Sequence, residues 1–200
     1  MIGLLIQDNA YEQDIRELLM SFYPGETYAH EVKDGLDFYV ETRLGDSAVS
    51  VLIWENGAAP EGWKLSDSRT RPSDLSDHSA TKNVIKKMFY LMLAARTGKE
   101  MPWGSLTGIR PTKIALTRLE EGWKEEDIRS FMKETYLASD EKIDLSIEIA
   151  AREKKLLEPL DYERGYSLYV GIPFCPTTCL YCSFTSYPIE KWRGRTGLYL

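Results

Sequence analysis

Apolar residues recur along the first hundred positions in patterns that predict a small α/β unit. The short apolar run Ile2–Ile6 predicts a strand. Four residues then follow at helical spacing: Ile15, Leu18, Leu19 and Phe22. Because that spacing places them on one face, they predict an amphipathic helix whose apolar side joins the core.

Two runs of alternating residues come next. Residues 38–44 and 49–53 alternate apolar and polar side chains, and Gly45-Asp46 lies between them. This pattern predicts a hairpin with glycine at positive φ. The following stretch, Asn56 to Ser79, is rich in Gly, Pro, Ser and Asp, and we expect a long loop pinned in part by Trp63.

A buried helix is expected after the loop, with Ser79 as its N-cap and Gly98 as its stop. Its apolar positions recur every three or four residues: Val84, Ile85, Met88, Phe89, Leu91 and Met92. We expect this helix to be largely buried, and Met88, Phe89 and Met92 to be plain core.

Residues 101–160 have the composition and spacing of a continuous helical segment. Pro111 suits the first turn of one helix and Gly122 its end, and a second helix is expected from about Glu125. Ser139 is a plausible cap for a third helix, although residues 143–149 also alternate as a strand does; the flanking residues favour helix. Pro159 marks a boundary before a polar linker at 161–165.

Composition and charge exclude several classes of protein. The chain has 200 residues, 43% of them hydrophobic and 28% charged, which suits a folded protein. Its formal net charge of -6 disfavours nucleic acid and anionic membrane surfaces as partners. Since no apolar run approaches the roughly 20 residues of a membrane span and the start lacks a signal-peptide pattern, we expect a cytoplasmic protein.

The three cysteines of the chain lie close together, in the sequence CPTTCLYC. An odd number of thiols on one short loop does not build a disulfide framework, so metal binding or redox chemistry is expected. Cys175, Cys179 and Cys182 have the spacing C-x3-C-x2-C, and they follow the apolar run Ser167–Ile172, which reads as a buried strand ended by Pro173. Three thiolates on a four-iron cluster leave one iron open.

The segment at residues 168–184, LYVGIPFCPTTCLYCSF, resembles the cluster loop of the radical S-adenosylmethionine superfamily. The resemblance implies that the three cysteines ligate a [4Fe-4S] cluster whose fourth iron binds S-adenosylmethionine. It further implies reductive cleavage of that cofactor to a 5'-deoxyadenosyl radical, which takes a hydrogen atom from the substrate. Tyr181 matches the position that packs near the adenine.

The pattern L-Y-x-x-I-P-F-C at 168–175 resembles one branch, the oxygen-independent coproporphyrinogen III oxidase group. In that branch the residue matching Tyr169 contacts S-adenosylmethionine. The resemblance implies oxidative decarboxylation of a porphyrinogen in heme synthesis, with a flavodoxin or ferredoxin type electron donor. Two positions depart from the branch: Gly171 replaces a histidine, and Phe184 replaces a further cysteine. The long N-terminal extension, with TGIRPTK at 107–113, is more similar to the bacterial coproporphyrinogen dehydrogenase subgroup.

Other readings of the same residues stay open. Chaperone-like members of the branch also lack the cysteine at the Phe184 position, so a heme-trafficking protein is an alternative. A structural zinc site is another, although zinc normally takes four protein ligands. The two tyrosines suit ordinary packing as well as a cofactor contact. Arg110 and Lys113 either contact an anion at a helix N-terminus or are simply solvated, and His30 and His78 suit surface or packing roles.

The expected fold class is therefore α/β: an N-terminal α/β domain at 1–100, a helical segment at 101–160, and the start of a radical S-adenosylmethionine core at 161–200. Radical S-adenosylmethionine folds resemble full or partial (β/α) barrels, which need on the order of 250 residues. We therefore expect an incomplete barrel in this chain, with Ser167–Ile172 lacking its partner strands, and a truncated chain that is inactive alone.

Overall fold

A computed structural model describes residues 1–200 of the chain apart from 33, 57–61, 109, 162–163, 185 and 200. The described residues divide into two units, Met1–Leu157 and Glu158–Leu200. The expected division at residues 100 and 160 stays a prediction. Among the helices described, none combines the length and hydropathy that a membrane-spanning segment needs.

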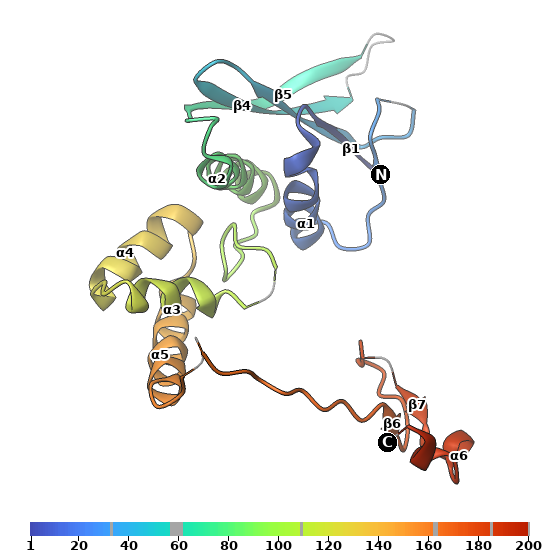
Figure 1. Ribbon diagram of the computed structural model, residues 1–200. Coiled ribbons are helices and arrows are strands. Elements are labelled where there is room, and N and C mark those ends of the chain that lie inside the picture. Colours follow the sequence, from blue (N-terminus) through green and yellow to red (C-terminus); the bar gives the residue numbers. More distant parts are fainter. Residues whose placement is uncertain (33, 57–61, 109, 162–163, 185, 200) are drawn as a thin grey trace. The chain divides into compact units, whose positions relative to one another are not determined.

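A five-stranded mixed sheet forms the first half of the N-terminal unit (Figure 1). Its strands are β1 (Ile2–Ile6), β2 (Tyr28–Ala29), β3 (Phe38–Leu44), β4 (Ala48–Asn56) and β5 (Trp63–Pro72). The order across the sheet is β2-β1-β3-β4-β5, with β1 parallel to both neighbours and the last three strands antiparallel. The predicted first strand and the β3–β4 hairpin are thereby confirmed, and so is the mixed α/β class. The glycine at positive φ expected in the hairpin turn is wrong, because Gly45 does not take a left-handed conformation.

Two helices cover one face of this sheet: α1 (Glu12–Phe22), which follows the short 3-10 helix η1 (Asn9–Tyr11), and α2 (His78–Thr97) (Figure 1). The predicted apolar face of α1 is confirmed, since Ile15, Leu18, Leu19 and Phe22 are fully buried. The α2 group of Met88, Phe89 and Met92 is also core, as expected. Alternate strand residues such as Val40 and Val51 complete this core from the sheet side.

The long loop expected between Asn56 and Ser79 is largely wrong, because β5 occupies residues 63–72. Residues 57–61 of that expected loop lie outside the described part. The hydrophobic pattern does not predict this strand, because it lies at the sheet edge and carries polar residues on both faces. Lys64, Arg69 and Arg71 are among them. Trp63 does pin this region, as its ring packs edge-on against Tyr39 with centroids 4.9 Å apart.

Helix α2 begins two residues earlier than predicted. Asp77, not Ser79, is the N-cap, and its carboxylate accepts a hydrogen bond from the backbone N–H of Ala80 at 2.9 Å. Both residues are good caps, so tertiary context decides between them. The predicted stop is confirmed, since Gly98 takes a left-handed conformation with φ of 67°.

Three helices form the second half of the unit: α3 (Thr112–Glu120), α4 (Glu125–Tyr136) and α5 (Asp140–Leu157). Pro111 and Gly122 flank α3, and Ser139 caps α5 through a hydrogen bond from the Lys142 N–H, all as predicted. The ambiguous stretch 143–149 is helical, with Ile143 and Ile147 buried. The prediction of helix from residue 101 onward is wrong, because the described residues before Thr112 form no helix and 102–105 is a turn.

Gly104 fixes that turn. Its φ is 57°, and a Cβ there would lie 2.0 Å from the carbonyl oxygen of Tyr136. We expect Gly104→Ala to lower the free energy of unfolding by at least about 2 kcal/mol more than Gly98→Ala, which costs about 1 kcal/mol. Gly98 is the matched control because its φ is 67° and no atom lies within 4 Å of the added Cβ. Equal losses in denaturant titrations of the two variants would contradict this explanation.

Lys86 joins the sheet-covering helices to the residues before α3. Only 6% of the residue is exposed, and its ammonium donates to the Thr107 hydroxyl at 2.6 Å and to the Asp14 carboxylate at 3.4 Å. Burial lowers the pKa of Lys86 below its ordinary value, and the nearby Asp14 opposes that shift. The folded protein therefore carries the cost of a desolvated charge at neutral pH.

Replacing Lys86 with methionine tests that cost. Asp14 keeps a second cation, since Lys82 lies 3.7 Å away, so Lys86→Met is expected to be neutral or more stable by about 1–2 kcal/mol at neutral pH. As pH rises through the lowered pKa toward 10.5, the native chain loses this proton more readily when folded, so it gains stability relative to the variant. A difference in unfolding free energy that is independent of pH up to that value would contradict the assignment. The exposed Lys124→Met serves as the control.

The C-terminal unit has little regular structure. It contains β6 (Phe174–Cys175) and β7 (Tyr187–Pro188), which pair in parallel, then α6 (Ile189–Trp192) and the 3-10 helix η2 (Thr196–Leu198). The strand predicted at Ser167–Ile172 is not formed, and side chains such as Leu168 and Ile172 are exposed. A strand is defined by ladder hydrogen bonds to a neighbour, and none pairs with this run in the described unit. Of the predicted linker at 161–165, residues 162–163 lie outside the described part.

Candidate functional site

The cysteine loop begins inside β6. Cys175 is the last residue of that strand and pairs with Pro188 of β7. Next to this pair, the Tyr187 backbone N–H donates to the Pro173 carbonyl at 2.7 Å. The first cysteine is therefore held by a backbone ladder, while the other two lie on the loop that leaves it.

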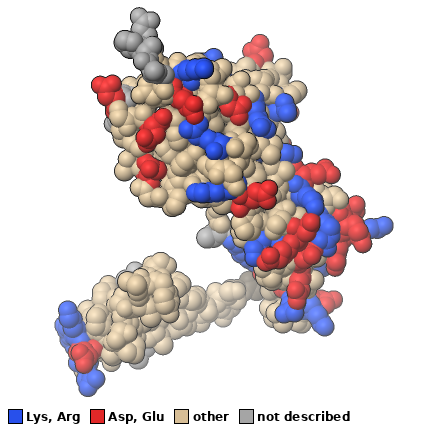
Figure 2. Space-filling model, turned by 180° about the vertical axis from the view of Figure 1, so that it is seen from behind, with Lys and Arg blue, Asp and Glu red and all other residues tan. Residues whose placement is uncertain are grey.

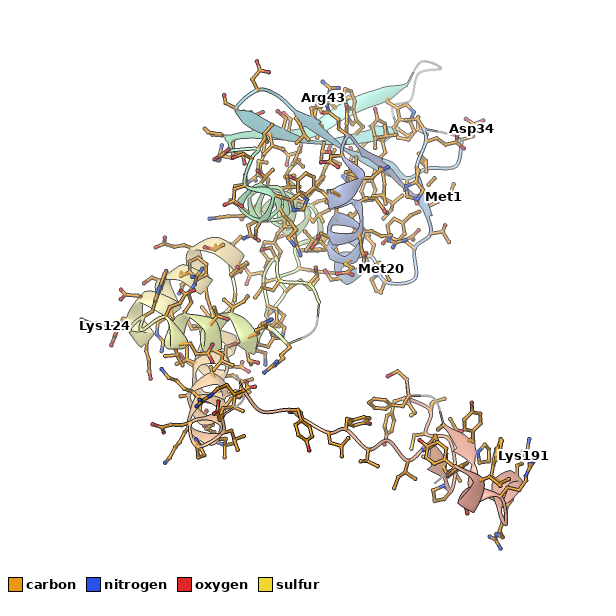
Figure 3. All side chains as sticks on the ribbon, viewed as in Figure 1. Met1, Met20, Asp34, Arg43, Lys124 and Lys191 are labelled. Atoms are coloured by element: carbon orange, nitrogen blue, oxygen red, sulfur yellow. The ribbon has the colours of Figure 1, made fainter. Side chains whose placement is uncertain are left out.

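An aromatic cluster anchors the base of the loop. The Phe174 ring packs against Trp192 and Tyr199, with centroids 5.9 and 5.4 Å away, and Trp192 also contacts Tyr187. The Tyr199 hydroxyl donates to the Gly171 carbonyl at 2.7 Å, which ties the end of the described chain back to the segment before the cysteines. Figure 3 shows this unit with Lys191 of α6 labelled. Sequence reasoning missed these anchors, since scattered aromatic residues give no spacing signal.

A turn brings the second and third cysteines together along the backbone. The Cys182 N–H donates to the Cys179 carbonyl at 3.0 Å, and the Cys182 thiol donates to the Phe184 carbonyl at 3.8 Å. All three cysteines are free thiols, with Cys179 exposed and the other two half-buried. Each remains accessible to a metal.

The chemistry of the three thiols suits an iron-sulfur cluster, but their arrangement in this structure does not. Three free thiols on an eight-residue loop are the soft ligands that such clusters use. Within the described residues, however, no three His, Cys, Asp or Glu side chains are grouped so that they could hold a metal ion. The ligand chemistry is present, whereas the three side chains have not converged.

The two tyrosines predicted to contact a cofactor are on the surface. Tyr169 is 86% exposed and Tyr181 is 90% exposed, so neither is used in the packing of this unit. The Tyr169 ring lies beside Gly171, where an added Cβ would be 3.2 Å from its Cε1. A larger residue at 171, such as the histidine of related proteins, would require this ring to move. Their roles toward a cofactor stay predictions.

The surroundings of the cysteines carry no charge. Residues 165–189 include no Asp, Glu, Lys or Arg, and Figure 2 shows a large uncharged surface on this unit. Leu180 and Phe184 are among the exposed apolar side chains beside the thiols. An uncharged loop of this kind can lie against a cofactor without burying an unpaired charge.

Comparison with known proteins adds a relative over almost the whole chain. The chain is 32% identical over 201 residues to the oxygen-independent coproporphyrinogen-III oxidase-like protein HemZ of Bacillus subtilis (strain 168). The alignment covers 98% of this chain and 40% of the length of that protein. No family model matches the chain, and no solved structure matches it. The resemblance predicted from the cysteine loop is thereby confirmed.

Proposed function

Since this chain is a relative of the oxygen-independent coproporphyrinogen III oxidase group, we propose that it takes part in a radical S-adenosylmethionine reaction on a porphyrinogen-like substrate. The observation that carries the proposal is the loop of three free thiols, C-x3-C-x2-C, inside a match that covers 98% of the chain. The chain spans 40% of the length of that relative. The proposed activity, substrate and partners are therefore those of a whole protein of this kind.

In this proposal Cys175, Cys179 and Cys182 hold a [4Fe-4S] cluster as thiolates. Because they would supply three ligands to four irons, one iron would stay open, and the resemblance implies that S-adenosylmethionine would bind there. When bound, the cluster supplies the electron that cleaves the sulfonium of that cofactor. Tyr169 and Tyr181, both exposed beside the loop, contact S-adenosylmethionine, the second of them near its adenine.

In this proposal the fold holds Cys175 in place and leaves Cys179 and Cys182 able to shift toward a cluster. The β6–β7 pair and the Phe174 aromatic cluster fix the backbone at Cys175. Cys179 and Cys182 lie on a surface turn that can close around an incoming cluster at little cost in packing. This division explains why the thiols have not converged in the described unit.

The substrate class follows from the relative's group: a porphyrinogen whose propionates are oxidatively decarboxylated to vinyl groups in heme synthesis. An electron donor of the flavodoxin or ferredoxin type, a cytoplasmic location, and the absence of nucleic-acid or membrane partners complete the proposal. The net charge of -6 supports the last point, because it offers polyanions no general attraction.

Anaerobic assays of the whole protein test the proposal in sequence. We expect reconstituted protein to contain iron and sulfide, to form 5'-deoxyadenosine from S-adenosylmethionine under reducing conditions, and to consume coproporphyrinogen III. Formation of 5'-deoxyadenosine with the porphyrinogen left untouched would overturn the substrate assignment. Zinc in place of iron and sulfide after anaerobic preparation would favour a zinc-stabilised interaction module instead.

Phe184 favours a second function, heme trafficking. This residue stands where the oxidases of the branch have a cysteine, and its side chain is 79% exposed two residues beyond the last ligand. An exposed apolar ring there suits contact with a porphyrin face. Tight stoichiometric binding of heme without porphyrinogen turnover would favour this function, and turnover would exclude it.

A further inference from the structure

The TGIRPTK segment lines a cavity that the cysteine chemistry does not use. The cavity has a volume of about 610 Å³ and lies wholly within the N-terminal unit. Its walls come from residues between 103 and 108, from Arg110 and Pro111, from α3 and the residue after it, and from the end of α4. Figure 1 shows where α3 and α4 lie in the N-terminal unit. This volume is within the range of about 300–1,000 Å³ that small-molecule sites occupy.

Cationic side chains predominate in the lining. Arg110, Lys113 and Arg118 line the cavity, against the single carboxylate of Glu121. This balance runs opposite to the net charge of -6 for the whole chain. The residues that line the cavity therefore carry a net positive charge.

The three cations differ in how far they are already paired. Arg118 bonds to Glu121 at 2.6 Å and stacks over the Trp123 ring, 4.7 Å from its centroid. Arg110 pairs with Glu153. Lys113 is exposed and makes no ion pair with any residue in the described part of the chain, so its ammonium is the charge most available to a ligand.

Aromatic and apolar side chains form the rest of the wall, chiefly Trp103, Leu106, Ile114 and Tyr136. The Tyr136 phenol is neutral at neutral pH, and burial raises its pKa further, so it does not repel an anion. A ligand that uses the whole cavity therefore needs an apolar body as well as a negative group.

The wall is held in shape before any ligand arrives. Gly104 lies against the Tyr136 carbonyl with no room for a side chain, and the buried Lys86 ammonium holds Thr107 at 2.6 Å. A site fixed in this way loses little conformational freedom on binding.

We propose that this cavity is a binding site for a small organic anion, one that carries a carboxylate or phosphate group on an apolar body. Lys113 contacts the negative group, and Trp103 and Tyr136 contact the apolar body. The inference does not rest on the proposed function, since no residue of the cysteine loop takes part.

Calorimetric titration of the 200-residue chain with 2-naphthoate, 1-naphthyl phosphate and neutral 2-naphthylmethanol tests the site. At least one anionic probe should bind clearly more tightly than the alcohol, and comparison of the two anions distinguishes a carboxylate from a phosphate. Lys113→Gln should weaken that probe about tenfold, the effect of losing one charged hydrogen bond. The matched control Lys124→Gln, an exposed lysine outside the lining, should leave affinity unchanged.

A second variant removes space instead of charge. Thr117 lines the cavity from the exposed side of α3, so Thr117→Trp should abolish binding while the thermal unfolding midpoint stays close to that of the native chain. Equal weakening by Lys113→Gln and Lys124→Gln, binding of the neutral alcohol as tight as that of the anions, or no binding of any probe would overturn the proposal.

Discussion

Cys179→Ser is expected to abolish the visible absorption of the iron-sulfur cluster in anaerobically reconstituted protein. Cys179 is the most exposed of the three thiols and the middle ligand of the loop. A serine hydroxyl is a harder, far less acidic donor than a thiol, so it replaces a thiolate poorly on iron. Since three ligands already leave one iron open, losing another should lower cluster retention by at least about an order of magnitude.

Thr177→Ala is the matched control, because Thr177 lies two residues away on the same loop and its side chain is not expected to be a ligand. Iron and sulfide content should stay unchanged in this variant. A Cys179→Ser protein that retains native iron and sulfide would show that the cluster is held by other side chains. The same comparison at Cys175 tests the ligand fixed by β6.

Phe89→Ala is expected to lower the free energy of unfolding of the N-terminal unit by about 3–5 kcal/mol. Phe89 is fully buried on α2, in the core shared by both sheet-covering helices and by alternate residues of the sheet. Removing its ring leaves a cavity that the surrounding residues cannot fill, because the sheet and α1 hold them in place. Such a loss is a large fraction of the total stability of a typical domain.

Leu156→Ala is the control for this measurement, since Leu156 is 74% exposed near the end of α5. Its replacement should change the free energy of unfolding by no more than about 0.5 kcal/mol. Denaturant titration followed by circular dichroism compares the two variants. A Phe89→Ala protein as stable as Leu156→Ala would contradict the assignment of a single packed core between α1, α2 and the sheet.

Local patterns predicted much of the N-terminal unit. The apolar faces of α1 and α2 and the β3–β4 hairpin were readable because their periodicity follows from one buried side per element. Strand β5 was missed because an edge strand with residues such as Lys64 and Arg69 has no apolar alternation. The turn at 102–105 was missed because Gly104 lies against the Tyr136 carbonyl, a contact that only the folded chain makes.

The two candidate sites also differ in how far the sequence predicts them. The cysteine ligands could be predicted because all three lie within eight consecutive residues, so spacing alone brings them together. The cavity could not, because Trp103, Arg118 and Tyr136 come from separate elements that only the folded chain assembles. Arg110 and Lys113 flank Pro111 in the sequence, but their spacing alone does not favour ligand binding over solvation.

Electron paramagnetic resonance of the reduced, anaerobically reconstituted protein, recorded before and after adding S-adenosylmethionine, tests the central claim most directly. Three cysteine ligands and one open iron predict a [4Fe-4S] signal that changes when the cofactor binds. A cluster signal that is identical with and without S-adenosylmethionine, or protein that contains no cluster, would contradict the account.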